Sequence, residues 1–381
     1  MPVEIDGPAD REAGVSIKRI TIVSARVGAG HDGAAAELAR RMRARGFAVD
    51  RHDFLDLLPG RLGQRLCDAY HRQLDVAPRS WDWLLGAMGS PGLSRAAIGL
   101  SKLATPRLRA ALDRPSELLV STYPLASHAL AHLRSSGLIA APLAVYLTDP
   151  SVHRLCVTPR ADLHLAPNDH AAAHARRLGA RRVEVATPVV APDFRPAADE
   201  HGKARARASF GLPRHGRFAL ILSGSWGVGQ VEQITRDVAA SGLVKPVVVC
   251  GRNDDLRHRL QRAGFAHVYG WVDEMANLMR ACDLVVQNAG GLTTMEALAT
   301  GLPVITYRCL PGHGRANAHV LDEAGTVPWI REPGALATAL ARVGTTTAAA
   351  PASHDPAALL EQLARPAAAS PAPVSLRAPA A

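Results

Sequence analysis

Residues 283–303, DLVVQNAGGLTTMEALATGLP, decide the fold of the second half of the chain. A short apolar strand ends near Val286, Gly290 and Gly291 make a tight turn, and a helix begins at about Leu292. A buried strand, a glycine turn and a helix form the repeating unit of doubly wound parallel sheets. These residues therefore predict an α/β domain.

The first turn of this helix has the chemistry of a nucleotide site. Its N–H groups and the hydroxyl of Thr293 suit a diphosphate, and Glu296, one turn further on, can accept two ribose hydroxyls. The next loop, LPGHGRAN at 310–317, faces the same side, where His313 and Asn317 offer donors to a sugar or a phosphate. An ordinary strand–turn–helix junction explains each residue alone but explains the whole string poorly.

Short apolar runs alternate with amphipathic stretches along the whole chain, which is typical of parallel α/β sheets. The expected strands are 20–24, 118–121, 143–147 and 162–166, and, in a second series, 218–223, 246–250, 267–269, 284–286 and 304–307. We predict two Rossmann-like, doubly wound domains at 18–188 and 204–343, joined by a polar, proline-rich linker at 189–203. Residues 1–17 and the Ala- and Pro-rich tail 344–381 are expected to be disordered.

A second glycine loop, SARVGAGHDG at 24–33, follows the first expected strand. Its Gly28-x-Gly30-x-x-Gly33 spacing matches the dinucleotide-binding fingerprint, and Asp50 and Asp53 follow about 20 residues on. Gly28 and Gly30 let backbone N–H groups approach a ligand closely. The match is weak when taken alone, so a nucleotide-dependent oxidoreductase stays open as an alternative.

His31, at the start of the following helix, is the candidate catalytic residue of this loop. Ligands of such sheets bind at the carboxyl ends of the strands, so its imidazole can act as a general base or hold an acceptor hydroxyl. The structural alternative is a side chain that caps the helix or packs on the loop.

Composition restricts the partners and the compartment. The net charge is +10, and residues 40–114 hold fourteen Arg and Lys against seven Asp and Glu, which favours nucleic acid, anionic lipid or phosphorylated partners. The five cysteines lack metal-like spacing and indicate free thiols of a reducing compartment. With a polar N-terminus and no apolar run long enough to span a bilayer, we expect a cytoplasmic protein, or one that binds the membrane from that side.

The basic segment 56–112 is the candidate membrane contact. Trp81 and Trp83 occur there among arginines such as Arg79, and tryptophan anchors in a basic stretch can lie on an anionic bilayer. The alternative is a buried helical subdomain whose arginines face water. No nucleic-acid-binding motif is present, so we expect no nucleic-acid partner.

Further motifs extend across both halves and indicate a family. The first half contains SARVGAGH, LTDP at 147–150 with His153 after it, and NDH at 168–170; the second contains SGSWGVG at 223–229, VCGRN at 249–253 and YGWVD at 269–273. Together with the Gly290 and Pro311 segments, they make 18–343 resemble glycosyltransferase family 28, and within it the diacylglycerol glycosyltransferases (monogalactosyldiacylglycerol synthase-like). The resemblance implies a GT-B fold, in which two Rossmann-like domains face each other across a cleft.

The resemblance also implies roles for the candidate residues. A UDP-sugar would bind the second domain, with the uracil near Arg252 and Val272, the diphosphate at Gly290, Gly291 and Thr293, the ribose at Glu296, and further contacts from Ser225, His313 and Asn317. A lipid acceptor would bind the first domain near Gly28 and Gly30, with His31 and Asp149 beside the reacting hydroxyl. No bound metal and no cofactor besides the UDP-sugar substrate are implied.

Two departures from the family leave the identity of the sugar open. The family's Lys-Pro before the glycine pair is Asn288-Ala289 here, and its Gly-Gln-Glu is Gly312-His313-Gly314. We therefore predict an enzyme that is peripheral on the inner face of the cell membrane. It transfers a hexose from a UDP-sugar to a lipid hydroxyl, and diacylglycerol is the expected acceptor. The alternatives are a polyprenyl-linked or natural-product acceptor, an oxidoreductase, or a nucleotide-sugar binder without turnover.

Overall fold

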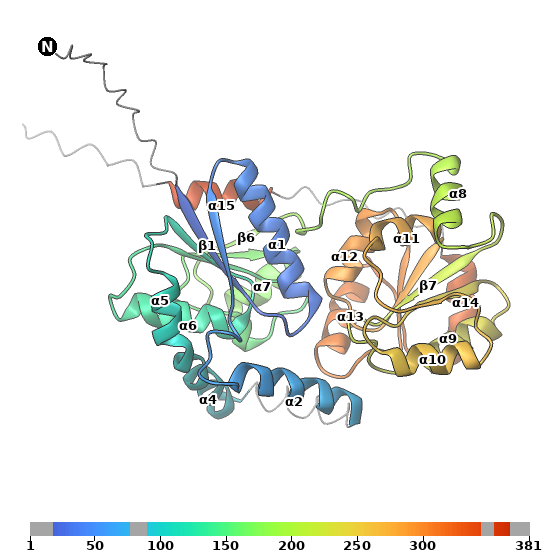
Figure 1. Cartoon of the computed structure of the whole chain (residues 1–381), viewed down its shortest axis with the longest axis horizontal. Helices are drawn as coiled ribbons and strands as arrows, with labels where there is room; N and C mark the ends of the chain where they lie inside the picture. The colour runs from blue at the N-terminus through green and yellow to red at the C-terminus, as the bar shows by residue number, and fades with distance from the viewer. Residues whose placement is uncertain (1–17, 77–89, 344–353, 366–381) are drawn as a thin grey trace, which may run out of the picture.

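The computed structural model describes residues 18–76, 90–343 and 354–365. They form two domains that lie side by side, each built on one six-stranded sheet (Figure 1). All strand pairs are parallel, and each sheet has an apolar core on both of its faces. This confirms the predicted α/β class with two Rossmann-like, doubly wound domains.

The first domain has the strand order β2-β1-β3-β4-β5-β6. Its strands are β1 (Arg19–Ser24), β2 (Ala48–Asp53), β3 (Leu118–Ser121), β4 (Leu143–Tyr146), β5 (Leu163–Ala166) and β6 (Val183–Val185). Its helices are α1 (Ala29–Ala44), α2 (Leu62–Val76), α4 (Pro91–Ser101), α5 (Thr105–Ala111), α6 (Pro124–Ser135) and α7 (Asp169–Arg177), with 3-10 turns η1 (Lys102–Ala104) and η2 (Arg154–Cys156).

The second domain has the strand order β12-β11-β10-β7-β8-β9. Its strands are β7 (Phe218–Leu222), β8 (Lys245–Val249), β9 (Val268–Tyr269), β10 (Leu284–Gln287), β11 (Val304–Tyr307) and β12 (Trp329–Ile330). Its helices are α8 (Glu200–Ser209), α9 (Val231–Ala240), α10 (Asp254–Arg262), α11 (Met275–Ala281), α12 (Leu292–Ala299), α13 (His313–Glu323) and α14 (Leu336–Arg342), with the 3-10 turn η3 (Pro333–Ala335).

The strands that the sequence predicts correctly are mostly continuous apolar runs, as strands covered on both faces must be. In β1, for example, Ile20 and Ile22 join the core on one face of the sheet and Val23 joins the core on the other. Strands β2, β6 and β12 were not predicted, and all three lie at sheet edges. Polar residues interrupt the apolar signal in β2 (AVDRHD) and β6 (VEV), and β12 has only two residues, too few to form a pattern.

The prediction that 344–381 is disordered is wrong for part of the tail. Residues 354–365 contain α15 (Pro356–Ala364), which returns to the first domain and packs beside α1 (Figure 1). Ala357 and Leu360 are fully buried there, and Arg45 forms ion pairs with Asp355 and Glu361. The surface that stabilises this helix belongs to the other end of the chain, so local composition does not reveal it.

The linker is shorter than the predicted 189–203. Helix α8 begins at Glu200, where the side chain of Asp199 accepts the N–H of Gly202 and caps it. Arg41 of the first domain donates a hydrogen bond to the carbonyl of Val190, and Arg280 of the second donates one to Asp193. The connection is thus fastened to both domains.

Residues 62–112, which lack a clear strand pattern in the sequence, are mainly helical in their described part, which contains α2, α4, η1 and α5. Arg79, Trp81 and Trp83 lie outside the described residues. Within those residues, no helix combines the length and the apolar character needed to cross a bilayer.

Candidate active site

The topology places the site at the domain interface. Ligands of doubly wound sheets bind beyond the carboxyl ends of the strands, where the strand order reverses. In the second domain this switch point lies between β7 and β10, which lead into loops 223–229 and 288–291. In the first domain it lies between β1 and β3, which lead to His31 and Thr122. The two edges meet, because a Cβ on Gly33 would lie 2.9 Å from Cδ2 of Leu292.

The Gly290 turn is held by Gln287, which the sequence analysis did not single out. This buried residue accepts hydrogen bonds from the N–H groups of Ala289 (2.8 Å) and Gly290 and donates one to Thr306 (2.6 Å). Gly290 has a φ of 79°, and a Cβ on it would lie 2.8 Å from Cβ of Asn317. Only glycine fits such a turn. The available signal was a glutamine ending an apolar strand, because a buried amide needs partners.

Glu296 carries a carboxylate with no hydrogen-bond or ion-pair partner among the described residues. Burial raises its pKa to about 7, so both protonation states are populated at neutral pH. The side chain is half-buried rather than fully exposed. A sequestered carboxylate without donors is unfavourable, and two ligand hydroxyls would satisfy it. This geometry supports the predicted ribose contact, which stays a prediction.

Other polar atoms near this turn are buried and also lack a partner among the described residues. They are Oγ of Ser223, Oδ1 of Asn288 and Oγ1 of Thr294. Thr293, the predicted diphosphate contact, is half-buried in the first turn of α12, and its neighbour Thr294 is the one whose hydroxyl is orphaned. Buried polar atoms in this state mark places where a ligand or a water binds.

Loops 223–229 and 250–253 interlock beside the turn. A Cβ on Gly227 would lie 2.3 Å from the carbonyl oxygen of Cys250, and one on Gly251 would lie 2.3 Å from that of Ser225. Both glycines have positive φ, and the N–H of Arg252 donates to the Ser225 carbonyl at 2.9 Å. The glycines therefore serve the approach of one loop to the other, whatever the ligand.

Arg252 lies between two tryptophan rings. Its guanidinium carbon is 5.3 Å from the ring centroid of Trp226 and 5.0 Å from that of Trp271, which is cation–π geometry. Trp271 is 50% exposed, and the predicted uracil contact Val272 packs against the domain core. The stack offers an aromatic base a flat surface beside Arg252, although the sequence analysis assigned no role to either tryptophan.

In the first domain, His31 is held across the switch point. Its Nδ1 lies 2.7 Å from the carbonyl oxygen of Thr122 and 3.2 Å from Oγ1 of Thr148. A carbonyl oxygen only accepts, so Nδ1 carries the proton and the neutral ring keeps its lone pair on Nε2. Burial lowers the His31 pKa; nearby Asp149 and the Thr122 carbonyl oppose this shift. His31 is therefore a neutral imidazole in the tautomer of a general base.

Asp149 and Asn317 meet across the domain interface. Asn317 Nδ2 donates to Asp149 Oδ1 at 3.1 Å, and the same carboxylate oxygen would lie 3.3 Å from a Cβ on Gly291. His313, in the first turn of α13, is close enough to His31 to lower its pKa. The structure thus brings His31, Asp149, Gly291, His313 and Asn317 together.

The Gly28 loop does not have the features of a dinucleotide site. Asp53 accepts the N–H groups of Arg26 (3.0 Å) and Leu55 (2.8 Å), and Asp50 pairs with Arg19, so neither acid is free for a ribose. A Cβ on Gly28 would have no neighbour within 4 Å, whereas Gly30 and Gly33 face Leu292 of the other domain. The spacing of Gly30 and Gly33 is explained by close packing between domains.

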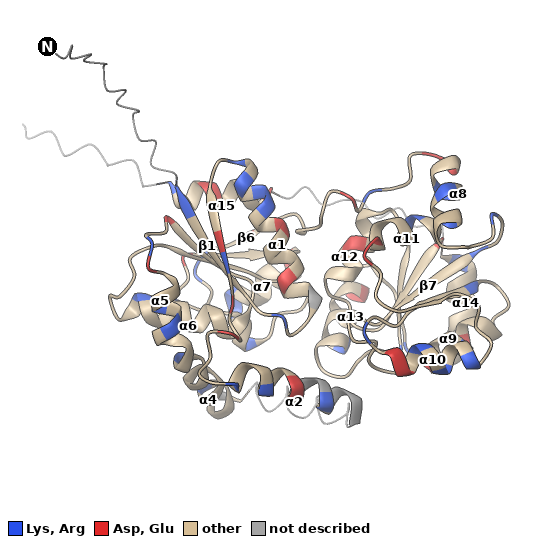
Figure 2. Ribbon diagram, viewed as in Figure 1, with Lys and Arg blue, Asp and Glu red and all other residues tan. Residues whose placement is uncertain are grey.

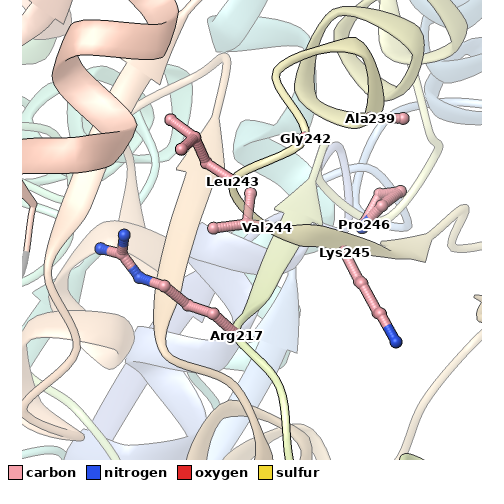
Figure 3. A pocket seen from close by; sticks show the side chains of 7 residues that line it. All are labelled: Arg217, Ala239, Gly242, Leu243, Val244, Lys245 and Pro246. Carbon is pink, nitrogen blue, oxygen red and sulfur yellow. The ribbon is translucent and has the colours of Figure 1, made fainter.

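A separate pocket opens at the opposite edge of the second sheet (Figure 3). It is lined by Arg217, Ala239, Gly242, Leu243, Val244, Lys245 and Pro246. These residues lie at the amino ends of β7 and β8, and Arg217 donates its hydrogen bond to the Val343 carbonyl. No predicted site residue lines this pocket, so it is not part of the candidate active site.

Comparison with known proteins agrees with this picture. A family model described as glycosyl transferases group 1 matches residues 228–345. Processive diacylglycerol beta-glucosyltransferase from Bacillus cereus is 26% identical over 237 residues, 58% of this chain and 58% of that protein. The Bacillus pumilus protein of the same name is 29% identical over 187 residues, 47% and 48% of the two chains. The chain thus matches about half the length of these curated relatives.

Solved structures share the fold over most of the chain. Sucrose-phosphate synthase from Thermosynechococcus elongatus matches with a TM-score of 0.56, at 15% identity over 85% of this chain and 89% of that one. An Arabidopsis thaliana protein complexed with UDP-L-rhamnose matches with a TM-score of 0.54, at 12% identity over 91% and 93%. The predicted resemblance is confirmed: this chain has the GT-B fold of glycosyltransferases, and its residues 228–345 match the group 1 family model.

Proposed function

We propose that the chain transfers a hexose from a UDP-sugar to a lipid hydroxyl, with diacylglycerol as the first acceptor to test. The observation that carries the donor half is the Glu296 carboxylate, which has no partner in the described part of the chain and lies one turn after the Gly290 turn, at the switch point of the sheet. A nucleotide's ribose supplies the paired hydroxyls that such a carboxylate lacks. The solved neighbour with UDP-L-rhamnose and the names of the curated relatives support the donor and the acceptor classes.

The first step of the reaction is assigned to His31. As the acceptor oxygen attacks the anomeric carbon of the sugar, its proton moves to Nε2, because Nδ1 is already protonated towards Thr122. The new carbon–oxygen bond replaces the bond to the diphosphate, and UDP leaves. Asp149, whose charge raises the His31 pKa, stabilises the imidazolium that forms.

The second requirement is to stabilise the negative charge on the departing diphosphate. Helix α12 begins at Leu292 behind Gly291, with no acidic residue in its first turn. The partial positive charge of this helix end lies next to Asp149 and the His31 side of the interface. Both halves of the transfer therefore act within one small volume.

A face of the first domain suits collection of a lipid from an anionic bilayer. Residues 90–112 contain no Asp or Glu. Leu93 and Leu103 are 45% and 48% exposed, and Arg95, Lys102 and Arg109 of the same segment are exposed as well; Figure 2 colours basic residues of α5 blue. Exposed leucines within a basic surface favour peripheral binding to anionic lipid.

The deciding experiment is turnover of UDP-glucose, UDP-galactose and UDP-glucuronic acid with diacylglycerol in phosphatidylglycerol-containing vesicles, with the product identified by mass spectrometry. A glycolipid from one donor supports reaction, acceptor and sugar together. UDP binding without a lipid product would move the acceptor to another class, and hydride transfer with NAD(H) would restore the oxidoreductase alternative.

The membrane arm has a matched control within the chain. Leu93→Glu and Leu103→Glu should release the protein from phosphatidylglycerol vesicles in a sedimentation assay, since each places a negative charge on the proposed contact. Leu243→Glu changes an equally exposed leucine of the second domain (42%) and should leave binding intact. Equal loss in all three variants would contradict the assignment of this face.

A further inference from the structure

Asn317 has a fully used side-chain amide at the domain interface. Its Oδ1 accepts from the N–H (3.1 Å) and the hydroxyl (2.5 Å) of Ser151, and its Nδ2 donates to Asp149 Oδ1 (3.1 Å) and to the Ala289 carbonyl (3.1 Å). An amide side chain can make four hydrogen bonds, and Asn317 makes all four while it is 0% exposed. It therefore has no remaining capacity for a ligand in this arrangement.

These four bonds join three segments. Asn317 belongs to α13 of the second domain, Ala289 to the glycine turn after β10, and Asp149 and Ser151 to the loop that follows β4 of the first domain. The close approach depends on Gly290, because a Cβ on that residue would lie 2.8 Å from Cβ of Asn317. The glycine that shapes the donor turn thus also admits the amide that reaches the other domain.

We infer that Asn317 is a positioning residue: it fixes Asp149 against the N-terminus of α12 and couples the donor turn to the loop beside His31. This rests on the proposed function, since Asp149 matters only if His31 takes a proton. It gives Asn317 a different task from the sugar contact that the family resemblance implies. A sugar ligand would change donor binding, whereas a positioning residue changes the alignment of groups already bound.

The two roles separate in the kinetics. With the amide removed in Asn317→Ala, Asp149 and Ser151 lose their partners across the interface, so the domains separate more readily. We expect kcat to fall about tenfold, the size of a coupling between groups in one hydrogen-bond network, while the affinity for UDP changes less than about twofold. Ser151→Ala removes only the hydrogen bond from the Ser151 hydroxyl to Asn317 and should lower kcat less.

Asn317→Asp distinguishes the hydrogen bonds to Ser151 from the one to Asp149. It keeps an acceptor for Ser151 but places a carboxylate against Asp149, and like charges at this distance repel. We expect it to lower kcat more than Ser151→Ala does. His319→Ala, on the exposed side of the same helix, is the control and should behave as the wild type.

The test combines steady-state kinetics on vesicles, UDP titration and small-angle X-ray scattering of the full chain. The expected result is a larger radius of gyration and a lower kcat for Asn317→Ala, with the Ser151→Ala and Asn317→Ala effects on kcat less than additive in the double variant. Unchanged scattering, or a raised KM for the UDP-sugar with kcat intact, would overturn the inference and favour a sugar contact. The scattering comparison needs no turnover. It therefore tests whether Asn317 holds the two domains together, independently of the proposed reaction. If Asn317→Ala does not fold, Ser151→Ala and Asn317→Asp carry the same comparison.

Discussion

The chain contains two glycine loops that look alike in sequence but differ in whether the acidic residue that follows each loop has a partner. Each follows a central strand, opens a helix and has an acid nearby. After the Gly28 loop, Asp53 accepts hydrogen bonds from two backbone N–H groups, and Asp50 forms an ion pair with Arg19. After the Gly290 turn, the Glu296 carboxylate has no partner among the described residues, and burial raises its pKa to about 7.

This difference shows what distinguishes a binding loop from a structural one. Glycines allow close approach in both loops, but the approaching group in the first is Leu292 of the other domain. In the second, buried polar atoms of Ser223, Asn288 and Thr294 have no hydrogen-bond partner among the residues that the structure describes. Unmet hydrogen-bonding capacity, more than glycine spacing, is what supports the proposed nucleotide contact of the Gly290 turn.

The largest effect is expected at His31, which follows the Gly28 loop. His31→Ala removes the proposed base, and we expect kcat to fall about a hundred- to ten-thousand-fold while UDP affinity is retained. Glycolipid turnover and UDP titration measure the two quantities. Full activity would reduce His31 to a side chain that packs on Thr122.

The next effect tests the other loop. Glu296→Ala removes the acceptor for the ribose hydroxyls, so UDP affinity should fall about ten- to hundredfold, the size of a lost hydrogen bond to a charged group. Isothermal titration with UDP checks this, and Asp53→Asn, on the structural loop, is the control that should leave the affinity unchanged. An unchanged affinity for Glu296→Ala would remove the distinction between the loops.

A smaller effect follows from the Glu296 pKa. Ligand hydroxyls donate to the ionised carboxylate, so the bound pKa lies below the free value of about 7, and binding releases a proton as the carboxyl ionises. Affinity for a UDP-sugar should therefore rise with pH, by up to about tenfold between pH 6 and pH 8. Glu296→Gln should flatten this profile, and a profile that survives in that variant would point to another titrating group.

The smallest effect concerns glycine itself. Gly28 has an extended φ of −155°, and a Cβ there would have no neighbour within 4 Å, so Gly28→Ala should cost no more than the about 1 kcal/mol by which glycine exceeds alanine at the N-cap of a helix. Gly227→Ala meets the Cys250 carbonyl at 2.3 Å with a φ of 57° and should cost about 1–3 kcal/mol or more. Thermal unfolding of the two variants measures the contrast, which equal losses would contradict.

The sequence determined the parts of this protein that depend on neighbouring residues. The apolar runs of β1, β7 and β10 require strands buried on both faces, and the strand–glycine–helix order places His31 and Glu296 at the carboxyl edge of each sheet. The edge strands β2 and β6 escaped prediction because polar residues interrupt their apolar pattern, and β12 because it has only two residues. Helix α15 was not predicted because the surface that stabilises it is on α1, about 310 residues earlier in the chain.

Only the tertiary structure decided how the candidate residues are used. Sequence cannot tell that Asp53 accepts two backbone N–H groups while Glu296 has no donor within 18–76, 90–343 and 354–365, because that depends on which groups fold against each carboxylate. Nor can it tell that the side-chain amide of Asn317 forms hydrogen bonds with Asp149, Ser151 and Ala289. Hydrogen bonds are short-ranged and directional, so their assignment is fixed only when segments far apart in the chain meet.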